Sequence, residues 1–235
     1  MTGLWALKMA QNSGLFHSED PAVWQKASDI YWDVIAAKGA KQKKLVSLDK
    51  WFQEELPPCI AARPHKHLTR EELVKLMEWK LTRGKFRPRL QQLVASNPDG
   101  AVETCTEKAF KLLPEVSAAI NELCQLKGIG PATASAVLAA GAPELTAFMA
   151  DEAVESIPGL TPVQYTLKHY LRYLEELRKK AAALSTEGSS EKWTPHQVEL
   201  CLWAWGVARK LCPNLLGSQE SGKIEERPKK KLKTK

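Results

Sequence analysis

The stretch LKGIGPATASAVL, residues 126–138, places the tightest constraint on the backbone of this chain. Gly128 and Gly130 permit positive φ angles and carry no Cβ atom, so a ligand or another segment of the chain can come close to the backbone at this point. Pro131 suits the first position of a helix, where its missing N–H costs nothing. Small and apolar residues on both sides predict two helices packed together, with Ile129 plugged between them. The stretch therefore predicts a helical hairpin with a glycine turn.

The turn of this hairpin sets backbone N–H groups at the start of a helix, where no preceding carbonyl accepts their hydrogen bonds. Such groups attract anions, and phosphate is the natural ligand of a site of this kind. We therefore expect an anion-binding turn formed by Gly128, Ile129, Gly130, Ala132 and Thr133. The alternative is a tight interhelical turn that binds no ligand.

Apolar residues at helical spacing also predict helices along most of the remaining chain, and no segment has the pattern of a strand. One helix is expected from Pro21 to Gly39. Another is expected over residues 45–56, capped near Ser47 and ended by the prolines at 57–58. The fold class that follows is all-α, with about ten helices.

The clearest helix start lies at Thr69, because Glu72 follows three positions later and the two residues form a capping box. Asn97 to Gly100 is a strong turn signal between two further helices. The other helices are expected over residues 87–96, 101–113, 114–126, 162–184 and 194–211, with a shorter one from Asp151.

These patterns divide the chain into three expected regions: a flexible N-terminus at 1–19, one helical domain at 20–217 with the hairpin at 123–141, and a disordered basic tail at 218–235. The formal net charge is +7, but the last thirteen residues carry seven Lys or Arg against two Glu. Their net charge of +5 leaves only +2 for the rest of the chain. A surface for nucleic acid must therefore be a local patch rather than a global field.

The tail contains PKKKLK, from Pro228 to Lys233, which has the form of a nuclear import signal. We therefore expect the import machinery as a partner and a nuclear location. The alternative is a solvated basic tail that aids solubility or grips phosphates without specificity.

The five cysteines stand at positions 59, 105, 124, 201 and 212, with no CxxC pair and no zinc or iron–sulfur spacing. We expect a reduced intracellular chain without a metal or other cofactor. His65 and His67 lack Cys or acidic partners nearby in the sequence and are expected at the surface. No apolar run approaches the length that spans a membrane, so no membrane contact is expected, and the chain is expected to be a monomer.

The hairpin with its flanking Leu, Ile and Ala residues resembles the helix-hairpin-helix DNA-binding motif. The following segment, APELTAFMADEAVESIPG, places Asp151 and Val154 where base-excision DNA glycosylases of the helix-hairpin-helix superfamily (HhH-GPD) have an Asp and a Val. The resemblance covers about residues 69–157. It implies a two-lobed, DNA-glycosylase-like helical fold, duplex DNA as the partner, and a role in base-excision DNA repair.

The same resemblance implies that Asp151 is the catalytic residue. A fixed carboxylate facing a sugar stabilises the oxocarbenium-like state in which an N-glycosidic bond breaks, and it can orient the attacking water. Asp151 also suits a helix N-cap in front of Glu152 and Glu155, and the two interpretations are compatible.

Bifunctional members of that superfamily carry a nucleophilic Lys early in the second hairpin helix, at the position of Ala132 in this chain. Without that amine, β-elimination has no mechanism at this position, so the expected activity is that of a monofunctional DNA glycosylase without lyase activity. Lys80 and Leu81 stand where family members often have Gln residues that fill the gap left by an extruded base. Leu81 is then a possible apolar wedge, and Trp79 the first choice for base stacking.

The segment RGKFRPR brings Arg83, Lys85, Arg87 and Arg89 close to the expected DNA face. If it touches DNA, contacts to phosphates are expected rather than readout of bases; the alternative is a solvated helix junction. Two further functions stay open beside the glycosylase: a non-catalytic duplex-DNA-binding protein that keeps the fold, and a protein-interaction scaffold in which the hairpin serves packing alone.

Overall fold

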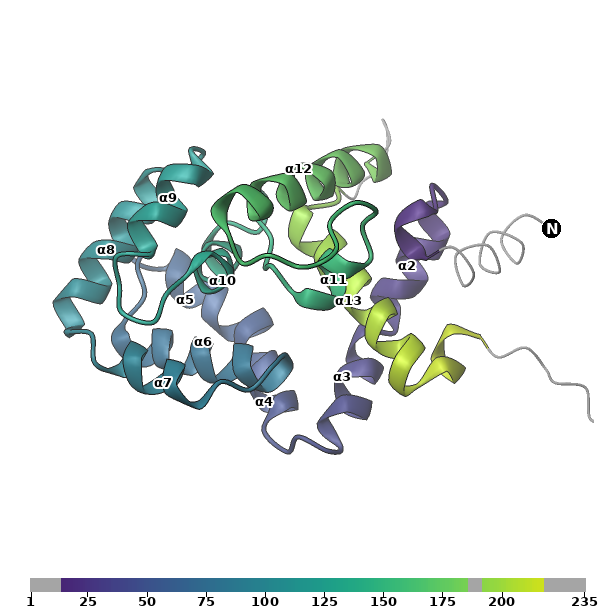
Figure 1. Ribbon diagram of the computed structural model, residues 1–235, viewed down its shortest axis with the longest axis horizontal. Coiled ribbons are helices and arrows are strands. Elements are labelled where there is room, and N and C mark those ends of the chain that lie inside the picture. Colours follow the sequence, from purple (N-terminus) through teal and green to yellow (C-terminus); the bar gives the residue numbers. More distant parts are fainter. Residues whose placement is uncertain (1–13, 186–191, 218–235) are drawn as a thin grey trace, which may run out of the picture.

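The computed structural model describes residues 14–185 and 192–217, and every regular element in these two ranges is helical (Figure 1). No strand occurs within them, so the all-α prediction is confirmed. The α-helices are α2 (Pro21–Asp29), α3 (Tyr31–Gly39), α4 (Leu45–Lys50), α5 (Leu56–Ala61), α6 (Arg70–Arg83), α7 (Pro88–Ala95), α8 (Asp99–Lys111), α9 (Val116–Leu123), α10 (Pro131–Gly141), α11 (Asp151–Glu155), α12 (Leu167–Leu184) and α13 (Pro195–Leu211).

Two helices, α13 and α10, each pack against several others. Helix α13 contacts α2, α3, α11 and α12, whereas α10 contacts α5, α6, α9 and α12. Figure 1 shows α10 enclosed near the middle of the molecule, with α8 and α9 on one side and α12 beside it. Every residue from Ala132 to Gly141 is buried, as expected for a helix that is apolar on all faces. The buried apolar side chains form one connected core, and the two-lobed arrangement stays a prediction.

The first two predicted helices are divided differently in the structure. The expected helix from Pro21 to Gly39 breaks at Ile30, and the break lets α2 and α3 both bury their apolar faces against α13. The expected stop at residues 57–58 is wrong. These prolines lie in the first turn of α5, and the chain stays helical through them, because a π-helical turn at Trp51–Glu55 leads directly from α4 into α5. Ser47 does not cap α4, since its hydroxyl donates to the Lys44 carbonyl.

Other boundaries follow the local signals. The capping box of Thr69 and Glu72 at the start of α6 is confirmed. The helix expected from residue 162 begins at Leu167 instead, because Thr166 caps it by accepting from the N–H of His169. The flexible N-terminus was expected to reach residue 19, but Leu15 lies in the core with 1% exposure. The tail at 218–235, with the import signal at Pro228–Lys233, lies outside the described residues.

Among the helices of the described ranges, none has both the length and the apolar character needed to cross a bilayer.

Candidate functional site

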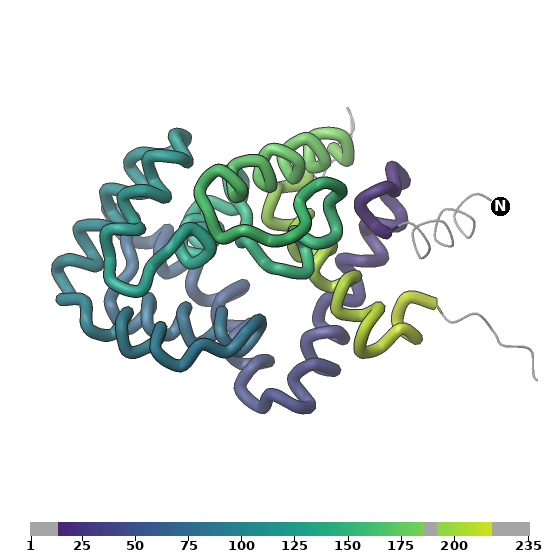
Figure 2. Tube along the Cα trace, in the orientation of Figure 1, coloured from purple at the N-terminus to yellow at the C-terminus, as the bar shows by residue number. Residues whose placement is uncertain are grey.

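The predicted hairpin is present, with α9 and α10 joined by a short glycine turn (Figure 2). Gly128 has a φ of +78°, which L side chains rarely adopt. Gly130 has extended backbone with φ −122° and ψ −179°, so a positive φ is required only at Gly128. Ile129 is buried between the helices, and Pro131 is the first residue of α10, as predicted.

The turn is fixed from outside by the end of α7. A Cβ atom at Gly128 would lie 2.9 Å from the Cβ of Leu93, so the turn packs directly on this helix. The side chain of buried Asn97 then holds the neighbouring residue: its Nδ2 donates to the carbonyl of Lys127 at 3.0 Å, and its Oδ1 accepts from the Lys127 N–H at 2.9 Å. Sequence reasoning assigned Asn97 only to a turn and missed this role.

The start of α10 leaves backbone donors available. The N–H groups of Thr133 and Ala134 both donate to the carbonyl of Gly130 at 2.9 Å. Within the described residues, the N–H groups of Gly130 and Ala132 have no hydrogen-bond acceptor. A Cβ atom at Gly130 would meet no atom within 4 Å, so the space in front of this residue is open. The turn therefore offers the unpaired amides of Gly130 and Ala132, the first of them at a residue beside open space, which suits an anion.

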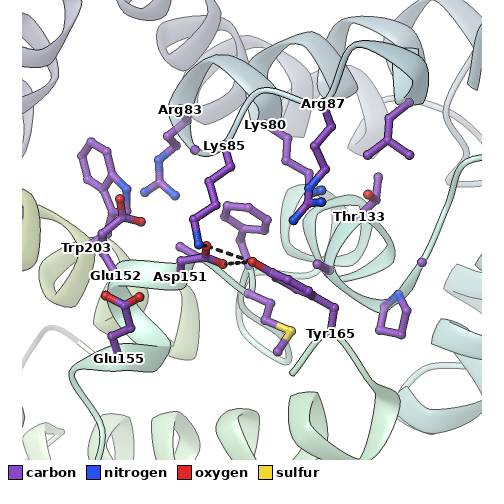
Figure 3. Close-up of a pocket in the computed structure, with 18 of the residues that line it drawn as sticks. Lys80, Arg83, Lys85, Arg87, Thr133, Asp151, Glu152, Glu155, Tyr165 and Trp203 are labelled. Carbon is purple, nitrogen blue, oxygen red and sulfur yellow. Dashed lines mark hydrogen bonds and ion pairs between the residues drawn. The ribbon is translucent and has the colours of Figure 1, made fainter. Parts of the chain in front are cut away.

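A pocket of about 440 Å³ opens beside this turn. Its wall is formed by the turn and the start of α10, by the end of α6 and the segment that follows it, and by the segment that leads into α11. Residues of the loop before α12 and of α13 complete the wall. Figure 3 shows Lys80, Lys85 and Arg87 on the α6 side, with Asp151 and Tyr165 opposite them. The volume is in the range of sites that enclose a small molecule, about 300–1,000 Å³.

Asp151 faces this pocket instead of capping a helix. It is the first residue of α11, whose N-cap is Ala150, and no side chain caps this helix. The hydroxyl of Tyr165 donates to its carboxylate, with the hydroxyl oxygen 2.8 and 2.9 Å from the two carboxylate oxygens, and the Nζ of Lys85 lies 2.7 Å from the same carboxylate. The hydrogen bond to Asp151 and partial burial raise the pKa of Tyr165, burial being the larger cause. The hydroxyl therefore stays a donor at neutral pH.

Buried side chains hold the segment that delivers Asp151. Two tyrosines of α12 reach it: Tyr170 donates to the carbonyl of Ala147 at 3.1 Å, and Tyr173 to that of Phe148 at 3.0 Å. From α10, the hydroxyl of Ser135 accepts from the Met149 N–H at 3.0 Å. Sequence reasoning missed all three positioning residues. The available signal was a pair of tyrosines on the buried face of an amphipathic helix, where each hydroxyl needs a partner.

The basic residues of the α6–α7 segment fall into two kinds. Lys85 and Arg87 are exposed, and Arg87 lies over the ring of Tyr165 at 5.8 Å. Arg83 is 1% exposed. Its guanidinium nitrogens lie 2.9 Å from a carboxylate oxygen of Glu199 and 3.7 Å from one of Asp49, and its guanidinium carbon lies 4.1 Å from the centre of the Trp203 ring. The prediction that Arg83 contacts DNA phosphate is therefore wrong, because its charge is used inside the protein.

The two residues suggested for base stacking and wedging are also in the core. Trp79 is fully buried, its ring stacks on Phe52 with centroids 3.6 Å apart, and its Nε1 donates to Asp49. Leu81 is 4% exposed. The apolar side chain that is exposed in this region is Phe86, at 74%, between Lys85 and Arg87. A lone aromatic within a basic segment was the signal for it.

Within the described residues, no group of three or more His, Cys, Asp and Glu is placed to hold a metal ion. No family model, curated protein or solved structure matches this chain. We therefore infer a function from the hairpin, the pocket and the residues that line them.

Proposed function

We propose that this protein binds duplex DNA through the α9–α10 turn and hydrolyses the N-glycosidic bond of a base flipped into the adjacent pocket. In this proposal the chain is a helix-hairpin-helix DNA glycosylase with a two-lobed fold, and Asp151 is the catalytic carboxylate. The observation that carries the proposal is the position of Asp151. Its side chain caps no helix and opens into a pocket that shares its wall with the glycine turn.

The DNA backbone would bind at the turn. The unpaired amides of Gly130 and Ala132 would donate to a phosphate, as in other helix N-termini that bind anions. The buried Thr133 lines the same wall. Arg87 and Lys85 are exposed cations that line the same pocket, and their contacts would be to phosphates rather than to bases. Affinity carried in this way falls as salt concentration rises.

The chemistry would centre on the carboxylate. As the base leaves, positive charge develops on the sugar, and a nearby fixed anion stabilises that state. Tyr165 orients the Asp151 carboxylate through the hydrogen bond that its hydroxyl donates, since the hydroxyl oxygen lies within 2.9 Å of both carboxylate oxygens. Ala132 offers no amine on α10, so this step is hydrolysis by water.

A second function, non-catalytic binding of duplex DNA, is favoured by one observation. Lys85 already neutralises Asp151 with an ion pair of 2.7 Å. If that ion pair persists on DNA, the carboxylate has no free charge to offer the sugar.

Base release is the measurement that separates these functions. The protein is incubated with duplexes carrying uracil, alkylated, oxidised or mismatched bases, and alkali then cleaves any abasic site formed. We expect release by the wild type and its loss in Asp151→Asn. Asp33→Asn is the matched control, because Asp33 is an exposed acid in the first turn of α3 and is not among the residues that line the pocket. Its release should equal that of the wild type.

Three outcomes would contradict the proposal in different ways. Undiminished release by Asp151→Asn removes the catalytic role of this residue. No release from any duplex, together with salt-dependent binding, selects the non-catalytic function. Absence of duplex binding leaves the hairpin as a packing element of a protein scaffold.

The nuclear location proposed from Pro228–Lys233 is tested separately, by comparing the cellular distribution of the full chain with that of a variant whose lysines in this stretch are replaced by Gln.

A further inference from the structure

Thr133, in the first turn of α10, differs from the other buried threonines of the described residues. Thr106 and Thr146 each donate their hydroxyl to a backbone carbonyl four positions earlier, at 2.8 and 3.0 Å. Thr133 is only 3% exposed and lines the pocket, yet its hydroxyl makes no hydrogen bond to any described residue. A buried hydroxyl without a partner costs free energy. A polar ligand in the pocket would give it one.

Two cations on the same side of the pocket have no partner of opposite charge within the described ranges. The amine of Lys80, which is half-buried, makes no hydrogen bond or ion pair there, and Arg87 makes no ion pair. Figure 3 shows Lys80, Arg87 and Thr133 on one side of the pocket. Burial lowers the pKa of Lys80 to about 8, and the positive charge of Arg87 lowers it further, although that of Asp151 acts in the opposite direction. An anion bound between the two cations would therefore relieve their repulsion.

A phosphate monoester has the charge and the acceptors that this side of the pocket calls for. Near neutral pH it carries a charge of about −1.5 to −2 and three acceptor oxygens, whereas a phosphate within a continuous strand carries a single charge. We propose that the pocket binds a phosphate monoester at Lys80, Arg87 and Thr133. Such a group is found at the 5′ or 3′ end of a nucleic-acid strand and on a free nucleotide.

The burial of Thr133 favours a terminal phosphate over one inside a strand. A group that reaches this hydroxyl has to enter the pocket. A terminal phosphate is joined to its nucleotide through one oxygen and can enter alone, whereas a bridging phosphate brings the strand on both sides with it. The proposal goes beyond base release, because it needs neither a flipped base nor hydrolysis. The amides of Gly130 and Ala132 stay available for the backbone of a duplex.

Gapped duplexes test the binding of strand ends. Three duplexes of one sequence have a single-nucleotide gap that carries a 5′ phosphate, a 3′ phosphate or hydroxyls alone, and fluorescence anisotropy gives the affinity of the full-length protein for each. We expect one phosphorylated gap to bind at least about tenfold tighter than the hydroxyl gap. Lys80→Gln should reduce this preference to within about twofold, and Thr133→Val should lower it about fivefold. Affinity for an intact duplex should stay within about twofold of wild type in both variants.

The stability of Thr133→Val separates a binding role from a structural one. Because the hydroxyl has no partner within the described residues, its removal should not lower the thermal midpoint. Thr146→Val is the matched control: it removes the hydrogen bond to Ala142 outside the pocket, so the midpoint should fall and the preference should not change. Lys75→Gln is the control for Lys80→Gln, since Lys75 is on the same helix but not among the pocket-lining residues. It should keep the wild-type preference.

Calorimetric titration with thymidine 5′-monophosphate and with thymidine tests free nucleotides. Binding of the monophosphate alone assigns the site to free nucleotides as well, whereas a preference among the gaps without it assigns the site to strand ends; both support the monoester. Equal affinity for the three gaps, together with no binding of the monophosphate, overturns the proposal. An unchanged preference in folded Lys80→Gln and Thr133→Val also overturns it.

These outcomes are distinct from failure of the proposed enzyme. A phosphate preference without base release from any duplex keeps this site and removes the glycosylase activity. Base release without a phosphate preference does the reverse.

Discussion

The Nζ of Lys85 lies 2.7 Å from the carboxylate of Asp151, across the mouth of the pocket from the turn that begins α10 (Figure 3). The two partners differ in exposure: the side chain of Lys85 is 66% exposed, whereas that of Asp151 is 17% exposed. An ion pair with one solvated partner is weak and readily exchanged. A phosphate group arriving at the pocket would therefore compete for Lys85 and leave Asp151 with Tyr165 alone.

This exchange predicts the behaviour of Lys85→Gln. If Lys85 moves from Asp151 to a phosphate, the variant should bind duplex DNA less tightly. The slope of its log affinity against log salt concentration should also be smaller by about one, the value for one lost phosphate contact. The slope of log affinity against log salt, measured by fluorescence anisotropy, gives this number. Lys179→Gln on the exposed face of α12 is the control, and its slope should match wild type. An unchanged slope in Lys85→Gln would mean that the ion pair with Asp151 persists on DNA.

The two glycines of the turn should respond differently to the same substitution. Gly128→Ala forces a Cβ against Leu93 at a positive φ, so we expect a loss of unfolding free energy of about 1–3 kcal/mol. Gly130→Ala meets open space at an extended backbone and should leave stability within about 0.5 kcal/mol. Its added methyl group instead narrows the approach to the unpaired amides.

We therefore expect Gly130→Ala to weaken duplex binding without a change in urea midpoint. Urea denaturation and binding isotherms of both variants provide the comparison. A stable Gly130→Ala protein that binds DNA as tightly as wild type would show that the turn does not contact the phosphate.

Arg83 and Arg87 should separate stability from binding. Arg83→Gln leaves Glu199 and Asp49 buried without their counter-charge, and breaking a buried ion pair costs about 3–5 kcal/mol. Arg87→Gln removes an exposed charge, so its thermal midpoint should stay close to wild type while its duplex affinity and salt slope fall. Calorimetry and anisotropy on the two variants give the result. A stable Arg83→Gln protein would contradict the structural role assigned to this buried arginine.

The pH dependence of stability should carry a contribution from His196. Burial is the main reason that its pKa falls to about 3, with the charge of Arg83 adding to it. Its Nε2 contacts the amide oxygen of Gln53 at 2.9 Å, and Glu199 lies 3.8 Å from Nδ1. The folded protein thus keeps this imidazole neutral, whereas the unfolded chain protonates it below about pH 6.5. The stability contributed by the neutral imidazole is present above about pH 6.5 and is lost as pH falls toward 3.

The variant His196→Phe removes this titration. As pH falls from 6.5 to 4.5, its unfolding free energy should rise relative to wild type, by up to about 1.4 kcal/mol per pH unit. Burial raises the pKa of Glu199, which acts in the opposite direction, but Glu199 is present in both proteins and largely cancels in the difference. Parallel curves of wild type and variant against pH would show that His196 is protonated in the folded state.

The parts of the site that follow from local sequence were predictable. The turn at Gly128, the helix start at Pro131 and the capping box at Thr69 depend on neighbours within a few residues, and all three are present. Asp151 was singled out by its place after the hairpin, and the structure places it in the same pocket as the turn.

The errors share one cause, which is contact between residues far apart in the chain. Arg83 reads as one more cation in a basic segment, but its partner Glu199 lies 116 positions away. Trp79 reads as a free aromatic near the same segment, yet Asp49 and Phe52 from the preceding helical stretch enclose it. Which cations stay in solvent is decided by this packing, and no local pattern reports it.

The two hydrogen bonds between the Asn97 side chain and the Lys127 backbone affect the free energy of binding. Because α7 fixes the turn through the side chain of Asn97 and the contact at Gly128, the two unpaired amides point in their final directions before any ligand arrives. An arriving phosphate would meet a rigid cradle and need not order the loop, so little conformational entropy is lost on association. Affinity for DNA should then depend on Asn97, a residue that does not itself contact the phosphate, because its hydrogen bonds to Lys127 hold the turn in the conformation that binds.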